Sequence, residues 1–321
     1  MGAIRMQTIA AAAIVSALFA GAVAAQDNEA VAPPPSPFGA EDSIGASNHL
    51  SPEGARRAAR LVRTGQVYAL GVVTGRQTPV GPGRSYSIAV LPIDDGGGSP
   101  MGENQVTGHD DILMTNVGIG TQLDGFAHIG ANRVHYNGVH ARDLYRPDGV
   151  VRFGTENIPP TATRGVLLDM TRQFDQNPVA AGTAFNRAEI VAAARAARVT
   201  IRAGDVVLFH TGWMAAHAES NPQGFVATQP GLGREGADYL ASLGVVMVGA
   251  DTAALEAIPF ENANQPFIVH QTLLTRRGVY ILENINTAEL ARDGATQFMF
   301  VLGQPRFQGS VQAVVNPIAI R

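Results

Sequence analysis

The sequence predicts a single domain of the α/β class, and three observations support this prediction. The second half of the chain alternates short apolar runs with helix-like segments, an order typical of α/β proteins. The 321 residues are 45% hydrophobic and 16% charged, which is enough apolar material for a large core. No interior stretch is rich enough in Pro, Ser or like charge to be a linker between domains.

Helices are predicted from caps and breakers. Ser51-Pro52-Glu53 has the composition of a capped helix start, and Gly65 follows the end of that segment. Asn186 and Glu189 form the capping-box pattern of a helix that runs to about Arg198. Two more helices are expected, over 233–243 and 265–274.

Strands are predicted from β-branched and apolar runs. In the first half, 67–74 and 85–91 are separated by Gly81-Pro82-Gly83 and are expected to form a hairpin, with another strand over 111–117. In the second half, buried strands are expected over 165–169, 205–209, 245–249, 279–282 and 297–302.

The N-terminus has the pattern of a secretory signal. Arg5 precedes an apolar run over 9–23, and small residues lead to a cleavage position near Ala25. We therefore expect a signal peptide over 1–25, a Pro-rich leader over 26–40 and the domain over 41–321, with the mature protein periplasmic or secreted and free of the membrane. The alternative is an uncleaved anchor, although the apolar run is shorter than the ~20 residues of a spanning helix.

Composition and motifs exclude several functions. The formal net charge is −4 and the basic residues are scattered, so a nucleic-acid partner is not expected. Phosphate-binding glycine loops, the Gly-x-Ser-x-Gly elbow and the His-Glu-x-x-His pair are all absent from the sequence. There is no cysteine, so any metal must be held by His, carboxylate or amide groups.

The segment from Thr115 to His128 carries the most chemistry. If Asp124 begins a helix after the Gly-rich turn, Asp124 and His128 project from the same helix face, four residues apart. One could bind a metal while the other moves protons. The alternative is structural, with an Asp that caps a helix and a hydrogen-bonded core His.

This segment resembles a known family motif. Thr121, Asp124 and His128 match His-x-Gly-Thr-His-x-Asp-x-Pro-x-His of the cyclase family, which includes bacterial kynurenine formamidases and isatin hydrolase-like enzymes. Further blocks resemble the family in the same order, and they are 39–50, 204–208 with Thr211-Gly212-Trp213, Gly249-Ala250-Asp251, the His270 segment and 281–284.

The resemblance implies a swivelling β/β/α domain with a mixed sheet core and surrounding helices. It also implies that Asp124, His270 and Glu283 are metal ligands and that His128 is the proton shuttle. Two carboxylates and one imidazole suit Zn²⁺ or Mn²⁺. We therefore expect one divalent metal ion as the cofactor.

Three positions depart from the family motif. Gly118 and Gln122 stand where the motif has its first two histidines, and Phe126 stands where it has Pro. A two-metal centre is therefore not expected, and Gln122 is predicted to hold the bound water or the substrate carbonyl. His109 could replace a lost ligand, and the alternative for it is a surface position.

Other residues are candidates for the pocket wall or for support of the ligands. His210 and Trp213 follow a buried strand, at the kind of strand end where α/β sites form, so they are candidates for substrate binding. For Trp213, plain core packing is an equal alternative. Asp251 also follows a strand and is expected to orient His270 or to cap a helix.

The resemblance implies hydrolysis of an amide, formamide, lactam or lactone in a small cyclic or aromatic substrate by metal-activated water. It also implies a homo-oligomer. Two alternatives stay open at this point. One is an exported, non-catalytic metal- or ligand-binding protein of the same fold, and the other is a cyclase or dehydratase that acts at a metal-polarised carbonyl.

Overall fold

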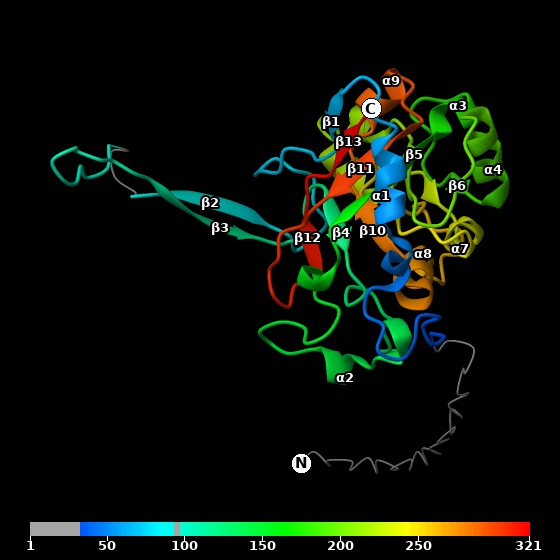
Figure 1. Cartoon of the computed structure of the whole chain (residues 1–321), viewed down its shortest axis with the longest axis horizontal. Coiled ribbons are helices and arrows are strands. Elements are labelled where there is room, and N and C mark those ends of the chain that lie inside the picture. The colour runs from blue at the N-terminus through cyan, green and yellow to red at the C-terminus, as the bar shows by residue number, and fades with distance from the viewer. Residues whose placement is uncertain (1–32, 93–96) are drawn as a thin grey trace, which may run out of the picture. The chain divides into compact units, whose positions relative to one another are not determined.

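A curled mixed sheet forms the centre of the molecule. The computed structural model describes residues 33–92 and 97–321, and within these the sheet has nine strands in the order β1-β13-β11-β5-β7-β9-β10-β4-β12 (Figure 1). Its strands are β1 (Val67–Ala69), β4 (Gln122–Asp124), β5 (Thr161–Asp169), β7 (Val206–His210), β9 (Met247–Ala250), β10 (Tyr280–Glu283), β11 (Gln297–Leu302), β12 (Gln312–Val314) and β13 (Ile318–Ile320). The mixed α/β prediction is confirmed.

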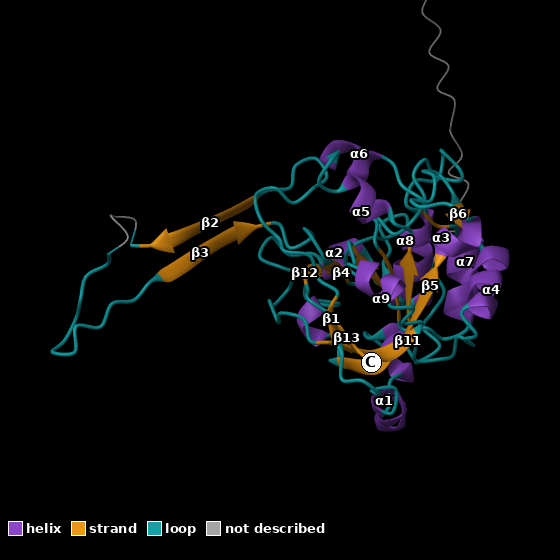
Figure 2. Ribbon diagram, turned by 90° about the horizontal axis from the view of Figure 1, so that it is seen from above, coloured by secondary structure: helices purple, strands orange, loops and turns teal. Residues whose placement is uncertain are grey.

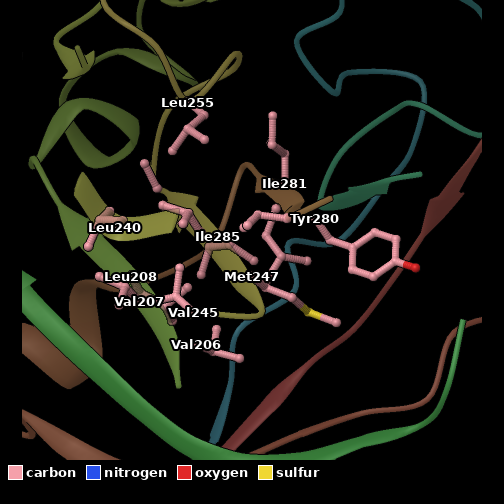
Figure 3. Packing of buried hydrophobic residues seen from close by; sticks show 14 of the residues in the cluster. Val206, Val207, Leu208, Leu240, Val245, Met247, Leu255, Tyr280, Ile281 and Ile285 are labelled. Atoms are coloured by element: carbon pink, nitrogen blue, oxygen red, sulfur yellow. The ribbon is translucent and has the colours of Figure 1, made fainter. Parts of the chain in front are cut away.

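The central strands are parallel and buried. β5, β7, β9 and β10 pair in parallel, while the flanking strands pair antiparallel. Every residue of β7, β9 and β10 is buried, as expected for parallel strands covered on both faces. Figure 3 shows the packing of Val206, Leu208, Met247 and Ile281 in this core. These are the apolar runs that the sequence predicts as strands.

Helices lie around the sheet (Figure 2). They are α1 (Pro52–Ala59), α2 (Ala141–Leu144), α3 (Met170–Phe174), α4 (Arg187–Ala196), α5 (Trp213–His217), α6 (Pro222–Ala227), α7 (Arg234–Ser242), α8 (Ile268–His270), which continues as the π-helix η5 (Gln271–Arg277), and α9 (Ala288–Arg292). Short 3₁₀ turns are η2 (Gly45–His49), η3 (Tyr136–Gly138) and η4 (Thr155–Asn157). The predicted caps are present, because Ser51 accepts from the Gly54 backbone N–H and Asn186 and Glu189 form a capping box.

A two-stranded ribbon projects from the body and is called the arm here (Figures 1 and 2). It consists of β2 (Tyr86–Leu91) and β3 (Asp110–Thr115), which pair antiparallel with Tyr86 opposite Thr115. The predicted hairpin between 67–74 and 85–91 is therefore wrong. The first of these strands pairs with β13 near the C-terminus, and strand-like composition cannot indicate so distant a partner. A separate small sheet pairs β6 (Ala184–Phe185) with β8 (Gly231–Leu232).

The packed chain begins before the boundary at Glu41 drawn from the sequence. Ser36 is buried, its backbone N–H donates to Asn137, and its hydroxyl donates to Asp42. The predicted signal peptide over 1–25 and residues 26–32 of the predicted leader lie outside the described residues. Among the residues described, no helix is long and apolar enough to cross a membrane.

Candidate metal centre

Asp124 lies on a strand, so the condition that it begins a helix is not met. Gln122, Leu123 and Asp124 form β4, and the chain then turns so that the His128 N–H donates to the Gly125 carbonyl. Alternation along a strand places Gln122 and Asp124 on one face and sends Leu123 into the core. The reason is tertiary, because β4 fills the space between β10 and β12.

Strand register gathers four polar side chains on that face of the sheet. β10 places Glu283 opposite Gln122, and β12 places Gln312 opposite Asp124. Directly opposed residues of an antiparallel pair project to the same side of the sheet. All four side chains are buried. A polar cluster of this kind inside a core requires a compensating partner for every charge.

Three potential ligand atoms converge at the centre of this cluster. The Nε2 atom of His270 lies 3.1 Å from Glu283 Oε1 and 3.8 Å from Asp124 Oδ2. The ligand atoms of these three residues all lie within 4.8 Å of one another. Ligands about 2.0–2.2 Å from a Zn²⁺ ion are separated by roughly 3–3.7 Å, so the trio has the spacing of a metal site. Asp124 Oδ2 is buried and has no hydrogen-bond partner among the described residues, which points to an ion as its partner.

The other oxygens of the two carboxylates are occupied by amide groups. Gln312 Nε2 donates to Asp124 Oδ1 at 2.7 Å, and Gln122 Nε2 donates to Glu283 Oε2 at 2.6 Å and to Asp124 Oδ1 at 3.2 Å. Each carboxylate therefore keeps one oxygen for an ion while the other is held by an amide. Through these contacts Gln122 holds both carboxylates in place.

Glu256 orients His270. Its Oε1 lies 2.5 Å from His270 Nδ1, and its carboxylate also accepts from the backbone N–H groups of Val269 and His270. A carboxylate at Nδ1 holds the proton there and leaves the Nε2 lone pair free for a metal. The sequence analysis misses Glu256, because it lies in a loop 14 residues before His270 and no motif marks it.

The electrostatics of the cluster favour bound positive charge. Burial and the nearby Asp124 raise the pKa of Glu283 to about 7, although the hydrogen bond from His270 opposes this shift. Burial acts to lower the pKa of His270, but contacts with Glu256 and Glu283 outweigh it and raise that pKa to about 10. Three carboxylates against the single Arg84 guanidinium leave two uncompensated negative charges when His270 is neutral. One divalent ion would neutralise them.

Gly118 makes room for Gln312. A Cβ atom at position 118 would lie 2.4 Å from Gln312 Oε1, so no larger residue fits while Gln312 keeps this position. The loss of the motif histidine at 118 thus accompanies the amide that holds Asp124. Phe126, at the position of the motif proline, stacks on Tyr280 in the core at 4.3 Å between ring centroids.

A pocket of about 380 Å³ opens onto the cluster. Gln122, His128, His270 and Glu283 line one side, and Arg84 enters from the segment that leads into the arm. Burial lowers the pKa of His128, and the nearby Asp124 only partly opposes this effect. His128 is therefore neutral near pH 7 and able to accept a proton. The volume suits a small organic molecule.

Four other predicted residues lie elsewhere. His109 is exposed at the start of β3 on the arm and does not line the pocket. His210 contacts Thr287 at 2.8 Å, and Trp213 donates from Nε1 to the Phe225 carbonyl, so both belong to packing away from the pocket. Asp251 accepts from Thr211 and Gly212 and lies beside His210, so it does not orient His270 as expected. Glu256 is the residue that orients His270.

A buried two-carboxylate, one-imidazole site at the base of a pocket defines a candidate metalloprotein of the mixed α/β class. The family model described as "Putative cyclase" matches residues 49–257, and the chain belongs to this family. No curated protein sequence matches the chain.

Solved structures agree with this assignment. A crystal structure described as a novel cyclase is 28% identical, covers 88% of this chain and 96% of its own, and superposes with a TM-score of 0.80. An isatin hydrolase bound to thioisatinate is 17% identical over 84% of this chain and 98% of its own, with a TM-score of 0.60. Isatin hydrolase A from Labrenzia aggregata is 15% identical over 79% of this chain and 93% of its own, with a TM-score of 0.59. The last two share the fold of this chain.

Proposed function

We propose that this protein is a metal-dependent hydrolase that cleaves an amide, formamide, lactam or lactone bond in a small cyclic or aromatic substrate. The observation that carries the proposal is the buried trio of Asp124, His270 and Glu283 at the base of a pocket that also exposes His128. The family and the shared fold of the isatin hydrolases support it.

Each residue of the site has a separate role in the proposed hydrolysis. A Zn²⁺ or Mn²⁺ ion held by the trio would acidify a water molecule and polarise a substrate carbonyl. Glu256 keeps the Nε2 atom of His270 available as a ligand. Neutral His128 accepts the proton of the attacking water and delivers it to the departing nitrogen or oxygen. Apolar residues of the pocket orient the substrate ring and exclude bulk water.

Metal analysis combined with an activity screen tests the proposal. The protein is stripped with a chelator, reloaded with Zn²⁺ or Mn²⁺ and assayed on formanilide, isatin and dihydrocoumarin. We expect one ion per chain and turnover of at least one of these compounds. Asp124→Asn should bind no ion, because it removes a buried charged ligand. Asp148→Asn is the matched control, since Asp148 is exposed and outside the pocket.

Two outcomes would count against the proposal. Equal metal binding by Asp124→Asn and the native chain would remove the assigned site. A fully loaded protein that is inert to all three compounds would favour the alternative of a metal- or ligand-binding protein.

We also propose that the chain assembles as a homo-oligomer through the arm. Of the sixteen large apolar side chains that are exposed in the described part of the chain, five lie on the arm and two on the connection between its strands. Those on the arm are Ile88, Val90, Ile112, Leu113 and Met114, and those on the connection are Met101 and Val106. The register places Leu113 on one face of the ribbon and Met114 on the other, so both faces are apolar. A two-stranded ribbon is only marginally stable in water by itself. A second copy related by two-fold symmetry would cover both arms at once.

A further inference from the structure

Arg84 brings a charged side chain into the pocket, where no described carboxylate lies within ion-pair distance of it. Its Nη1 donates to the Gly118 carbonyl and, at 3.3 Å, to Gln122 Oε1. Both acceptors are neutral, and no carboxylate among the described residues forms an ion pair with Arg84. The Nε and Nη2 groups have no hydrogen-bond partner within the described chain, so the guanidinium, which lines the pocket, keeps donors free. A half-buried guanidinium of this kind is suited to a planar anionic group.

The position of Arg84 relative to the metal site is fixed by one side chain. The Gln122 amide accepts from Arg84 through Oε1 and donates to Glu283 Oε2 at 2.6 Å through Nε2. The guanidinium and the metal ligands are therefore one amide group apart. A molecule that contacts both must carry its anionic group within a few bonds of the reacting carbonyl.

Most of the remaining pocket lining is apolar. Its walls include Pro79, Val80, Ile119, Val226, Ile258 and Phe267. Among the residues described as lining the pocket, Arg84 is the one charged or titratable side chain besides the metal ligands and His128. Polar groups that are few and well placed determine which ligand a mostly apolar pocket selects.

We propose that Arg84 binds a carboxylate of the substrate, and that the pocket takes small aromatic or cyclic acids whose carboxylate lies next to the bond that is cleaved. This inference rests on the proposed hydrolase function, because it assumes that the acid is a substrate. Binding of the acid does not itself require turnover. The competing role for Arg84 is purely internal, as a counter-charge for the buried carboxylates Asp124 and Glu283.

Binding of a matched pair of probes separates the two roles. The metal-loaded protein is titrated calorimetrically with 2-aminobenzoate and with 2-aminobenzamide, which differ in charge but little in size. We expect the native chain to bind the acid about tenfold or more tightly, the value of one charge-assisted contact. Arg84→Met should lose this preference while its affinity for the amide stays within about twofold. Arg84→Lys should keep part of the preference, because a point charge remains without the two-pronged geometry.

Controls make the result specific. Arg76→Met removes the same charge from an exposed position outside the pocket and should leave the preference unchanged. Metal content is measured for every variant, and a loss of metal in Arg84→Met that Arg84→Lys restores would support the counter-charge role and overturn the proposal. Equal binding of both probes by the native chain, or an unchanged preference in Arg84→Met, would also overturn it.

Turnover distinguishes this proposal from the hydrolase function. In the native chain, 2-formamidobenzoate should have a lower KM than 2-formamidobenzamide, and Arg84→Met should equalise the two KM values. If the native chain binds the acid more tightly than the amide but hydrolyses neither compound, the acid site stands and only the hydrolase function is contradicted. Hydrolysis of both with equal KM would contradict only the acid site.

Discussion

At the scale of single residues, Glu256 determines how His270 presents itself to an ion. The carboxylate is buried and contacts both the imidazole Nδ1 and the backbone N–H groups at the start of α8. Removing its charge while keeping its shape should weaken the metal site without removing a ligand. Loss of a hydrogen bond that supports a metal ligand typically lowers metal affinity by about 10- to 100-fold.

We therefore predict that Glu256→Gln lowers the affinity for Zn²⁺ by about 10- to 100-fold, because the neutral amide holds the Nδ1 proton less strongly and adds no negative charge. Competition with a chromophoric chelator measures this change. Glu235→Gln, on the exposed face of α7, should bind Zn²⁺ as the native chain does. An unchanged affinity in Glu256→Gln would show that His270 is held in place by packing alone.

The proposed role of His128 is proton transfer and not metal binding. It lines the pocket, and burial keeps its imidazole neutral. We predict that His128→Gln lowers kcat by about 10²- to 10⁴-fold, the usual range for a general acid–base residue, and leaves one ion bound per chain. Steady-state kinetics and metal analysis on the same sample test both statements. His49→Gln, at an exposed histidine, is the control. Loss of the ion in His128→Gln would reassign the residue as a ligand.

At the scale of elements, strand register builds the site. β4 contributes Gln122 and Asp124, and its neighbours contribute Glu283 and Gln312 directly opposite them. The sequence motif predicts Asp124 as a ligand but does not show that it lies on a strand. Its spacing of four to His128 fits a helix equally well. The segment is a strand because it pairs with β10 and β12, and that pairing is a long-range property of the fold.

Because such long-range pairing cannot be read from the sequence, only some of the site residues can be predicted from it. Asp124, His270 and Glu283 lie in blocks that resemble the family, and the structure brings these three together. Glu256, Gln312 and Arg84 lie in segments without a motif, and only the folded chain places them beside the ligands. Asp251 follows a strand as a supporting residue often does, yet its carboxylate faces Thr211 and Gly212. Position in the chain alone does not separate these cases.

The carboxylate of Asp42 helps to hold the N-terminal segment to η3. Asp42 accepts hydrogen bonds from the Tyr136 hydroxyl at 2.6 Å and from Ser36 at 2.7 Å. Burial acts to raise the pKa of Asp42, but these hydrogen bonds and one from the Ile44 backbone outweigh it and lower the pKa below its ordinary value of 3.8. The hydrogen bonds therefore stabilise the fold above that pH, and their contribution is lost as the pH falls through the lowered pKa.

We predict that Asp42→Asn lowers the free energy of unfolding at pH 7 by about 1 kcal/mol, a value reduced because the site is partly open to solvent. The difference from the native chain should shrink as the pH falls below about 4. Urea unfolding curves at several pH values measure it. Glu41→Gln, at the exposed neighbour, is the control and should change the stability little. A difference that stays constant from pH 7 to pH 3 would contradict the charge-dependent role of Asp42.

At the scale of the whole molecule, the arm is continuous with one part of the pocket lining. Residues 79–82 and Arg84 line the pocket and lead directly into β2. The ribbon beyond them exposes apolar side chains on both faces, together with two open strand edges. Native proteins rarely leave such edges and faces uncovered. A partner that covers the arm would therefore also steady the pocket wall that carries Arg84.

We predict that the native chain is oligomeric in solution and that the double substitution Leu113→Asp and Met114→Asp dissociates it, because each face of the ribbon then carries a charge that cannot be buried without a partner. Light scattering coupled to size exclusion measures the mass. Val191→Asp, at an exposed apolar position on α4, should keep the native mass. A native chain that elutes as a monomer, or a double variant with the native mass, would show that the arm is not the interface. The dissociated variant should still bind one metal ion, because the ligands lie on β4, α8 and β10 and none belongs to the arm.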